Sequence, residues 1–330
     1  MTMGVWLLRR ILQAVLVVLA MSVIVFVGMH FVGSPVDVLL SQESTLEDRE
    51  RLIRDLGLDQ PIWIQYLNFL VSALHGEMGR SFVYNTPAVT LILQRLPATL
   101  ELAFAALIIA VAIGVPLGLF AGLKPNNPLA RLITTGSILG FSLPTFWVGL
   151  LLIMVFSVQM GLLPASGRGE TVRFLGAEWS FPTLDGLRHL ILPAVNLSLF
   201  KVSMVIRLTR SGVREVVALD YVKFARAKGL SPLRIVRMHI LRNTMIPLVT
   251  VLGLELGSTI AFAVVTESIF AWPGAGKLIL DSINALDRPV VVAYLLVVVT
   301  LFVTINLIVD ILFRILDTMV RIGGGAQLAL

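Results

Sequence analysis

The chain has 330 residues, of which 57% are hydrophobic and only 14% are charged. Its mean hydropathy is +0.92, whereas an average soluble domain carries about 25% charged residues. Side chains this apolar do not cover a water-facing surface, so the composition excludes an ordinary soluble enzyme and a disordered chain. The absence of cysteine excludes disulfides and thiolate chemistry. The four histidines are scattered without a metal-ligand spacing, so we expect no metal site.

Apolar runs of about 20 residues, the length that crosses a bilayer, occur six times along the chain. They cover Ile11–Val32, Pro97–Leu123, Leu132–Leu163, Leu190–Ile206, Ile246–Ala271 and Val290–Val309. The first run is too long for the apolar region of a cleaved signal peptide and ends without a small-residue cleavage site, so we interpret it as a retained signal-anchor helix. The sequence therefore predicts an all-α integral membrane protein with six transmembrane helices.

Basic residues indicate how these spans are oriented, because cytoplasmic loops are enriched in lysine and arginine. Basic residues flank alternate ends of the spans, and the richest group lies between the fourth and fifth spans: Lys201, Arg207, Arg210, Arg214, Lys223, Arg226, Lys228, Arg234, Arg237 and Arg242. Six spans with both termini in the cytoplasm place all of these groups inside and the mixed-charge segment after the first span outside. Topology thus explains the net charge of +6, and we expect no nucleic-acid partner.

The segment Pro273–Lys277 resembles the end of a phosphate-binding loop without meeting its requirements. Such a loop needs a glycine where this chain has Ala271, and a serine or threonine where it has Leu278. The sequence also lacks the motifs of zinc proteases and serine hydrolases. We therefore expect no nucleotide site and no catalytic residues in this chain.

The segment from Ser211 to Pro247 is too basic to enter the membrane and too apolar on one side for a plain loop. Val213, Val217, Tyr221 and Phe224 recur at helical spacing, Gly229 is suited to stop that helix, and Ser231 and Pro232 are suited to begin the next one. The pattern predicts a helix, a sharp corner and a second helix. Periodicity alone leaves two interpretations open: an amphipathic helix on anionic lipid, or a helix that docks into a cytoplasmic partner.

The stretch Tyr221–Ser231, followed by Leu241–Pro247, resembles the EAA loop of bacterial ABC importer permeases, and most closely that of the B-type subunit of the dipeptide/oligopeptide (Dpp/Opp) family. Further segments resemble that family in the same order: Gly57–Pro61, Gln65–Tyr66, Leu163–Arg168, His189–Pro193, Thr266–Gly274 and Asn306–Asp310. Two departures are visible. Lys223–Ala225 replaces the Glu-Ala-Ala of the loop's name, and Leu316–Arg321 stands where the family usually ends in an Asp-Pro-Arg type sequence.

The resemblance implies a type I ABC importer permease fold, with an outer-side segment between helices 1 and 2 and a cytoplasmic coupling helix between helices 4 and 5. Residues 1–95 would form the signal anchor and outer segment, 96–318 the transmembrane domain with its EAA loop at about 211–247, and 319–330 a cytoplasmic tail. The residues expected to couple to an ATPase are Asp220, Tyr221, Ala225, Arg226, Ala227, Lys228, Gly229 and Leu230.

The same resemblance implies a set of partners in the bacterial inner membrane. They are a second, homologous permease subunit of the C type, one or two cytoplasmic ATPase subunits, an extracytoplasmic solute-binding protein and membrane lipid. ATP and magnesium would bind the ATPase subunits, and this chain would bind no cofactor. The ligand would be a dipeptide, an oligopeptide or a related small solute. A stand-alone channel or secondary carrier remains an alternative, although it would need a repeat with paired broken helices, and none is visible.

The segment from Glu267 to Pro289 is expected at the outer mouth, between the last two spans. Pro273 and Gly274 break the helix there, and Phe270 and Trp272 are suited to the membrane interface. Glu267 and these four residues are therefore candidates for an outer gate. The segment forms either a re-entrant hairpin facing the translocation path or a plain outer turn.

Lys201 and Glu255 are ionisable residues inside the fourth and fifth spans, where a lone charge is costly. Lys201 lies six residues before Arg207 and Glu255 eight residues after Pro247, so at about 1.5 Å per residue the two sit roughly 9 Å and 12 Å above the same boundary. Similar depth favours an intramembrane charge pair. Separate exposure to a water-filled path, or a lysine that reaches toward the inner surface, remain alternatives.

Overall fold

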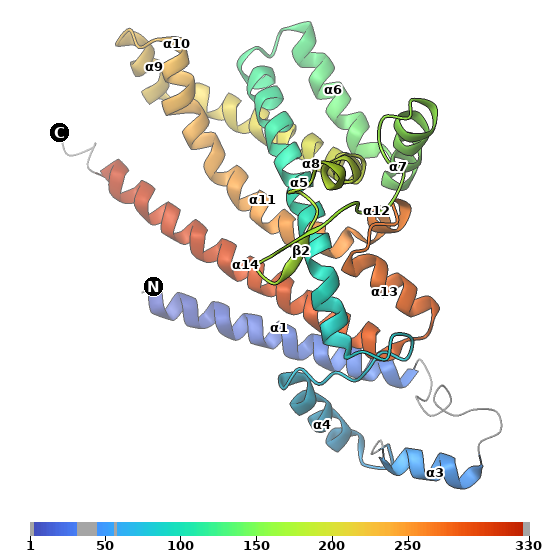
Figure 1. The fold of residues 1–330 in the computed structure, drawn as a ribbon. Coiled ribbons are helices and arrows are strands. Elements are labelled where there is room, and N and C mark those ends of the chain that lie inside the picture. The colour runs from blue at the N-terminus through green and yellow to red at the C-terminus, as the bar shows by residue number, and fades with distance from the viewer. Residues whose placement is uncertain (1–2, 32–44, 56–57, 326–330) are drawn as a thin grey trace. The chain divides into compact units, whose positions relative to one another are not determined.

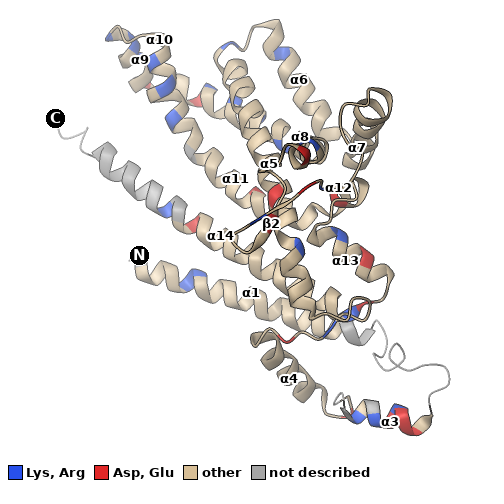
Figure 2. Cartoon of the chain, viewed as in Figure 1, with Lys and Arg blue, Asp and Glu red and all other residues tan. Residues whose placement is uncertain are grey.

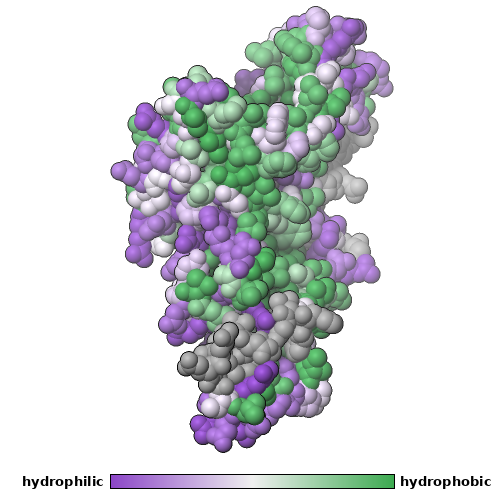
Figure 3. Space-filling model, turned by 90° about the vertical axis from the view of Figure 1, so that its right-hand side faces the viewer, coloured by the Kyte–Doolittle hydropathy of each residue, from purple (hydrophilic) through white to green (hydrophobic). Residues whose placement is uncertain are grey.

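The computed structural model describes residues 3–31, 45–55 and 58–325, most of which are helical (Figure 1). Four helices within these ranges are long and apolar enough to cross a membrane: Gly4–Gly28, Ala88–Leu123, Leu184–Val217 and Arg288–Ile311. Two bent pairs also meet this criterion: Pro128–Ser142 with Thr145–Gln159, and Pro232–Met245 with Pro247–Phe262. With each pair taken as one span, the described residues hold up to six spans, as predicted. Figure 3 shows broad hydrophobic areas on one face, as lipid contact requires.

The chain divides into two compact units. Unit 1 consists of Met1–Leu96 and Leu278–Leu307, and unit 2 of Pro97–Lys277 and Ile308–Leu330. Three helices, α5 (Ala88–Leu123), α13 (Ala275–Asn284) and α14 (Arg288–Gly325), continue from one unit into the other. Residues 319–325 of the expected tail are the last residues of α14, and 326–330 lie outside the described residues.

Unit 1 contains α1 (Met3–Phe31), α3 (Leu46–Asp55) and α4 (Ile62–Leu74). The helix α1 packs on α4 through aromatic rings, with the centroids of Phe26 and Tyr66 5.3 Å apart, and the hydroxyls of Ser22 and Tyr66 are 2.9 Å apart. This pairing places Ile62–Leu74, part of the segment that the sequence analysis predicted on the outer side, beside α1. Part of that predicted segment, residues 33–44 together with Gly57, lies outside the described residues.

A buried carboxylate organises the turn before α5 in unit 1. Asp287 is fully buried and accepts hydrogen bonds from the hydroxyl of Ser81 and from the backbone N–H of Phe82, at 3.1 Å in the second case. A buried charge is tolerated only when donors satisfy it. These contacts therefore fix the 81–83 turn to the start of α14.

Unit 2 is built around the crossing of α5 with α8 (Leu184–Val217). Three glycines of α5 at four-residue spacing, Gly114, Gly118 and Gly122, leave no room for a side chain. A Cβ at Gly118 would lie 2.7 Å from the carbonyl oxygen of Ile206 and 2.7 Å from the Cβ of Thr209. Small residues at this spacing let two membrane helices approach backbone to backbone. The sequence analysis did not single out this motif.

The third predicted span, Leu132–Leu163, is not one straight helix. The structure divides it into α6 (Pro128–Ser142) and α7 (Thr145–Leu152), which continues as the π-helix η1 (Ile153–Gln159), and the two parts meet at 103°. Leu143 has extended backbone angles and Pro144 follows it, so the helical hydrogen-bond ladder stops there. The sequence analysis did not anticipate this break inside the third span.

A short hairpin, β1 (Val172–Phe174) with β2 (Ala177–Trp179), interrupts the helices of unit 2 and was not predicted. A buried ion pair beside the hairpin ties this loop to α5: Arg168 Nη2 lies 2.8 Å from Glu101 Oε2 and donates to the carbonyl of Glu178 at 2.7 Å. The other oxygen of Glu101 accepts from Ser180, through both its N–H and its hydroxyl. Both oxygens of the Glu101 carboxylate thus accept hydrogen bonds, which offsets the cost of burying its charge.

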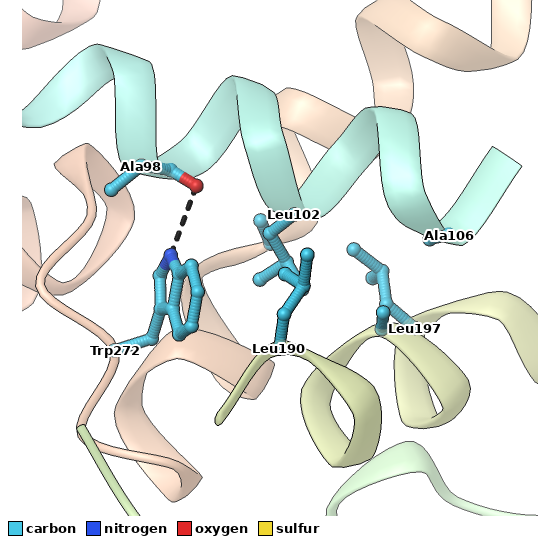
Figure 4. Close-up of a cluster of buried hydrophobic side chains, with 8 residues drawn as sticks. Ala98, Leu102, Ala106, Leu190, Leu197 and Trp272 are labelled. Atoms are coloured by element: carbon cyan, nitrogen blue, oxygen red, sulfur yellow. Dashed lines mark hydrogen bonds between the residues drawn. The ribbon is translucent and has the colours of Figure 1, made fainter. Parts of the chain in front are cut away.

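The apolar core of unit 2 lies between α5, α8 and the segment after α11 (Figure 4). Leu102 and Ala106 of α5 meet Leu190 and Leu197 of α8 there. Trp272 closes the cluster, and its indole N–H donates to the carbonyl of Ala98 at 2.9 Å. The indole is thus both buried and hydrogen-bonded, which is how tryptophan is stable in a core.

Candidate functional site

The predicted corner is present, but its helices begin and end at other residues than expected. The helix α8 runs on to Val217, eleven residues beyond the predicted end of the fourth span, so Val213 and Val217 belong to it. A break at Ala218 and Leu219 precedes the short helix α9 (Asp220–Ala227). The expectation of a single helix from Val213 to Phe224 is therefore wrong, because the residues at this helical spacing belong to two helices, α8 and α9.

Gly229 forms the corner with a left-handed backbone, φ being +75°. No atom lies within 4 Å of a Cβ built there, so only the backbone angle requires glycine. The next helix starts with Pro232 in its first turn, as predicted. Ser231 occupies the N-cap position, but its side chain makes no capping hydrogen bond, which corrects the expected role of its hydroxyl.

The second helix of the corner is continuous with the fifth span. It consists of α10 (Pro232–Arg234), the π-helix η2 (Ile235–Leu241) and α11 (Arg242–Phe262). Pro247 therefore lies inside the helix, where the two parts meet at 43°, and not at the start of a new one. One helix, bent by 43° at Pro247, thus leads from the corner into the membrane span.

One face of α9 packs on its own chain. Val222 and Ala225 are 0% and 4% exposed and join a buried cluster with Val213, Ile235 and Ile240. The expectation that Ala225 meets a partner subunit is therefore wrong, because helical periodicity does not tell which apolar face stays inside. The hydroxyl of Tyr221 accepts a hydrogen bond from the side-chain amide of Asn243 at 2.8 Å, so this side chain also connects α9 to the start of α11.

The opposite face of α9 is open, and the residues that follow the helix are open as well. Of the remaining predicted coupling residues, those exposed are Asp220, Tyr221, Arg226, Ala227, Lys228 and Gly229. Leu230 is half-buried and packs against the inner cluster. The sequence analysis left Phe224 out of this set, although its side chain is 61% exposed. The ammonium of Lys228 lies 4.6 Å from the centre of the Phe224 ring. Figure 2 shows basic residues gathered on α9 and α10, and the structure thus presents an aromatic ring within a basic surface.

An exposed ion pair marks the start of α9. Lys223 Nζ donates to Asp220 Oδ1 at 2.8 Å, and this hydrogen bond holds the pKa of the Asp220 carboxyl below its usual range. Burial raises the pKa of the Tyr221 hydroxyl, against the effect of its hydrogen bond with Asn243. A negative side chain in the first turn also favours the helix through its dipole.

The residues predicted to form an outer gate lie in a largely buried, hydrogen-bonded cluster around Glu267. After α11, α12 (Val264–Ile269) presents Glu267, which is fully buried. Its Oε1 accepts from the hydroxyl of Thr99 at 2.6 Å and its Oε2 from the N–H of Lys277 at 2.8 Å. The same hydroxyl of Thr99 accepts from the N–H of Ala275 at 2.8 Å. Glu267 therefore holds α12, α5 and the start of α13 together.

The expected interfacial position of Phe270 and Trp272 is wrong, because their side chains are 1% and 0% exposed. They pack inside unit 2, and the carbonyl of Phe270 accepts from the N–H of Gly167 at 2.9 Å. Pro273 is half-buried and Gly274 buried in the turn that follows. A gating role for these residues stays a prediction.

The structure places Lys201 and Glu255 in an ion pair between α8 and α11. Ser258, one turn further along α11, donates to the same carboxylate oxygen at 3.1 Å. The side chain of Lys201 is 9% exposed and that of Glu255 24%. The pair is therefore buried on its cationic side and partly open on its anionic side.

Two family models match the chain. Residues 114–322 match the family described as "Binding-protein-dependent transport system inner membrane component", and residues 3–103 match the corresponding N-terminal family. Together they span almost all described helices. Both the glycine motif of α5 and the α9 corner fall within the first match.

Curated relatives are similar over nearly their full length. The dipeptide transport system permease protein DppB of Escherichia coli (strain K12) is 35% identical over 335 residues, covering 96% of this chain and 98% of that one. The di/tripeptide permease DppB of Pseudomonas aeruginosa (strain UCBPP-PA14) is 39% identical over 302 residues, covering 88% and 90%. The oligopeptide permease AppB of Bacillus subtilis (strain 168) is 38% identical over 317 residues, covering 96% and 98%.

Solved structures share the fold at low sequence identity. An inward-facing structure of the MetNI methionine ABC transporter superposes with a TM-score of 0.54 at 18% identity, covering 69% of this chain and 97% of that one. A second crystal form gives a TM-score of 0.55 at 19% identity, with the same coverage. The likeness shows that the helical fold is that of a type I ABC importer permease.

Proposed function

Because the chain belongs to the family of binding-protein-dependent transport system inner membrane components, we propose that it forms half of the path by which an ABC importer takes up dipeptides or oligopeptides. The names of the relatives from Escherichia coli, Pseudomonas aeruginosa and Bacillus subtilis support the peptide class. A second, homologous permease subunit of the C type supplies the other half. A solute-binding protein on the outer side delivers the ligand.

The observation that carries this proposal is the α9 corner. No nucleotide-binding motif is visible in the sequence, so in this proposal energy reaches the chain by contact, and α9 offers a short helix with one face anchored and the other open. Phe224 and Lys228 provide an apolar and a cationic contact on the open face, which suit a groove with an apolar floor and an acidic rim. We assign α9 as the coupling helix that docks on a cytoplasmic ATPase subunit.

Nucleotide chemistry belongs to the partners in this proposal. ATP and magnesium bind the one or two ATPase subunits, and this chain binds no cofactor and catalyses no reaction. Since α9 then faces the cytoplasm, both termini lie on that side of the inner membrane. The basic residues around α9 agree with this orientation, because cytoplasmic loops are enriched in lysine and arginine, and they also suit anionic lipid headgroups.

Reconstitution tests the proposal directly. Proteoliposomes that contain this chain, its C-type partner and the ATPase subunits are expected to import labelled dialanine only when the loaded binding protein is outside and ATP is inside. The control contains an ATPase variant that binds ATP without hydrolysing it, and no import is expected from it. Import by this chain alone, driven by an ion gradient, would indicate a secondary carrier. ATP-driven import of another solute class with no peptide import would contradict the peptide assignment.

A further inference from the structure

The Lys201–Glu255 pair lies within two membrane-spanning helices, where an ionisable residue is costly and generally has a function. Packing alone does not explain it, because apolar residues of similar size often stabilise a protein as well as a buried ion pair does. The two side chains differ in exposure, at 9% for Lys201 and 24% for Glu255. The anionic member is the accessible one.

The contacts of Glu255 leave one of its oxygens available. Lys201 and Ser258 both bind Oε2. Among the described residues, Oε1 has no hydrogen-bonding partner. Lys201 is held from another side by the ring of Phe200, with its Nζ 5.6 Å from the ring centre. The pair therefore consists of a fixed lysine and a carboxylate that still accepts a donor.

The broken third span lies beside this pair. The ring of Phe141, at the end of α6, packs on Phe200 with centroids 4.5 Å apart, and a Cβ on Gly140 would lie 2.7 Å from the hydroxyl of Ser203. Phe200 and Ser203 flank Lys201 on α8. The break at Leu143 and Pro144 follows directly, and every residue from 141 to 147 is exposed in this chain.

Exposed irregular backbone at membrane depth is informative, because lipid does not hydrogen-bond to it. Such breaks are tolerated where they are buried by protein or line a water-filled cavity, and broken helices flank the ligand sites of many transporters. The break at residues 143–144 adjoins Phe200 and Ser203, and Glu255 pairs with Lys201 between them, so both features lie at one level of α8, where a water-accessible path is expected. Two independent features of unit 2 locate it at the level of Lys201.

We propose that Glu255 binds the ammonium group of the passing ligand, with Lys201 as the buried counter-charge that balances Glu255 when no ligand is present. The ligand class is a peptide with a side-chain ammonium group, such as a short peptide that contains lysine. The ammonium hydrogen-bonds to Oε1, and no covalent bond changes. This inference rests on the proposed peptide import and adds a contact residue to the path.

A charge swap tests the inference without removing the ion pair. Proteoliposomes with the complete importer and saturating loaded binding protein are assayed for import of lysyl-alanine and of aspartyl-alanine, and the ratio of the two rates is measured. The double variant Lys201→Glu with Glu255→Lys retains a pair but presents a cation to the ligand. We expect the ratio of lysyl-alanine to aspartyl-alanine import to fall about tenfold, since like charges at close range oppose binding.

A neutral double variant, Lys201→Met with Glu255→Gln, provides the same readout if the swapped protein does not fold. It is expected to lower the ratio about threefold, because the attraction is lost without a repulsion taking its place. An unchanged ratio in a folded double variant, whatever the absolute rates, would overturn the inference and leave the pair as a clamp between α8 and α11. Failure of the wild-type importer to take up either peptide would instead contradict the proposed function.

Discussion

Gly274 and the carboxylate of Glu267 occupy adjoining space so closely that a Cβ on the glycine would overlap the carboxylate atoms. Glu267 accepts from Thr99 and from the N–H of Lys277, so it has no freedom to move away. Gly276 is similarly constrained, since a Cβ there would lie 2.8 Å from Glu267 Oε2. The two glycines are therefore required by the space that a buried acid occupies.

Gly274→Ala is expected to lower the stability of the folded chain, because the added methyl displaces a satisfied buried carboxylate. A cost of about 1–3 kcal/mol is typical of overpacking. The midpoint of thermal unfolding in detergent measures it. Gly136→Ala is the matched control: no atom lies within 4 Å of its Cβ, and alanine in a helix interior should stabilise by about 0.5–1 kcal/mol. Equal midpoints for the two variants would contradict the prediction.

Gly118→Ala should weaken the crossing of α5 and α8, because its Cβ would lie 2.7 Å from the backbone oxygen of Ile206. Backbone does not rotate away as a flexible side chain does, so we expect a loss of about 1–3 kcal/mol and a lower yield of folded protein. Gly28→Ala on α1, with no atom within 4 Å, serves as the control. Wild-type yield and unfolding midpoint in Gly118→Ala would show that the helices separate at little cost.

Gly229→Val is expected to uncouple ATP hydrolysis from uptake, because a β-branched residue is strained at φ of +75° and shifts α9. Asparagine tolerates this region, so Gly229→Asn should retain coupling. The number of ATP molecules hydrolysed per peptide imported is the measurement. If valine and asparagine give the same ratio as glycine, the corner does not depend on the left-handed backbone.

Phe224→Ala should reduce co-purification of the ATPase subunit while leaving the chain folded, because 61% of the ring is already exposed. Val222→Ala is the comparison on the buried face of α9. It is expected to lower the unfolding midpoint, since deleting buried methyl groups costs about 1 kcal/mol or more. Unchanged recovery of the ATPase with Phe224→Ala would remove this ring from the docking surface.

The sequence was sufficient to predict those features that depend on the allowed backbone angles of a single residue. Gly229 supplies the left-handed corner and Pro232 begins the next helix, and both follow from one residue's allowed angles. The break at Pro144 could not be predicted in this way. Pro97, Pro116 and Pro193 lie inside helices that continue through them, and Pro247 bends its helix by 43° without ending it, so a proline in an apolar run does not by itself indicate where a helix ends.

Contacts between residues that are far apart in the chain could not be predicted from the sequence. The helical spacing of α9 separates two faces, but only the packing of Ile235 and Ile240 makes Ala225 the inner one. The pairing of Arg168 with Glu101 joins residues that are 67 positions apart, and neither stands in a recognisable motif for the pair. The depth of Lys201 and Glu255 was accessible because helix geometry converts residue counts into distance.

The bend at Pro247, inside the helix that runs from Pro232 to Phe262, has a mechanical consequence. If the helix tilts at this bend, a residue further along it moves further than a residue next to the bend. Glu255 lies eight residues beyond Pro247, or about 12 Å along the helix. A tilt of about 10° around Pro247 would therefore carry Glu255 by about 2 Å, enough to stretch its contact with Lys201 beyond hydrogen-bonding range. A tilt of the helix at Pro247 would therefore change the length of the contact between Lys201 and Glu255.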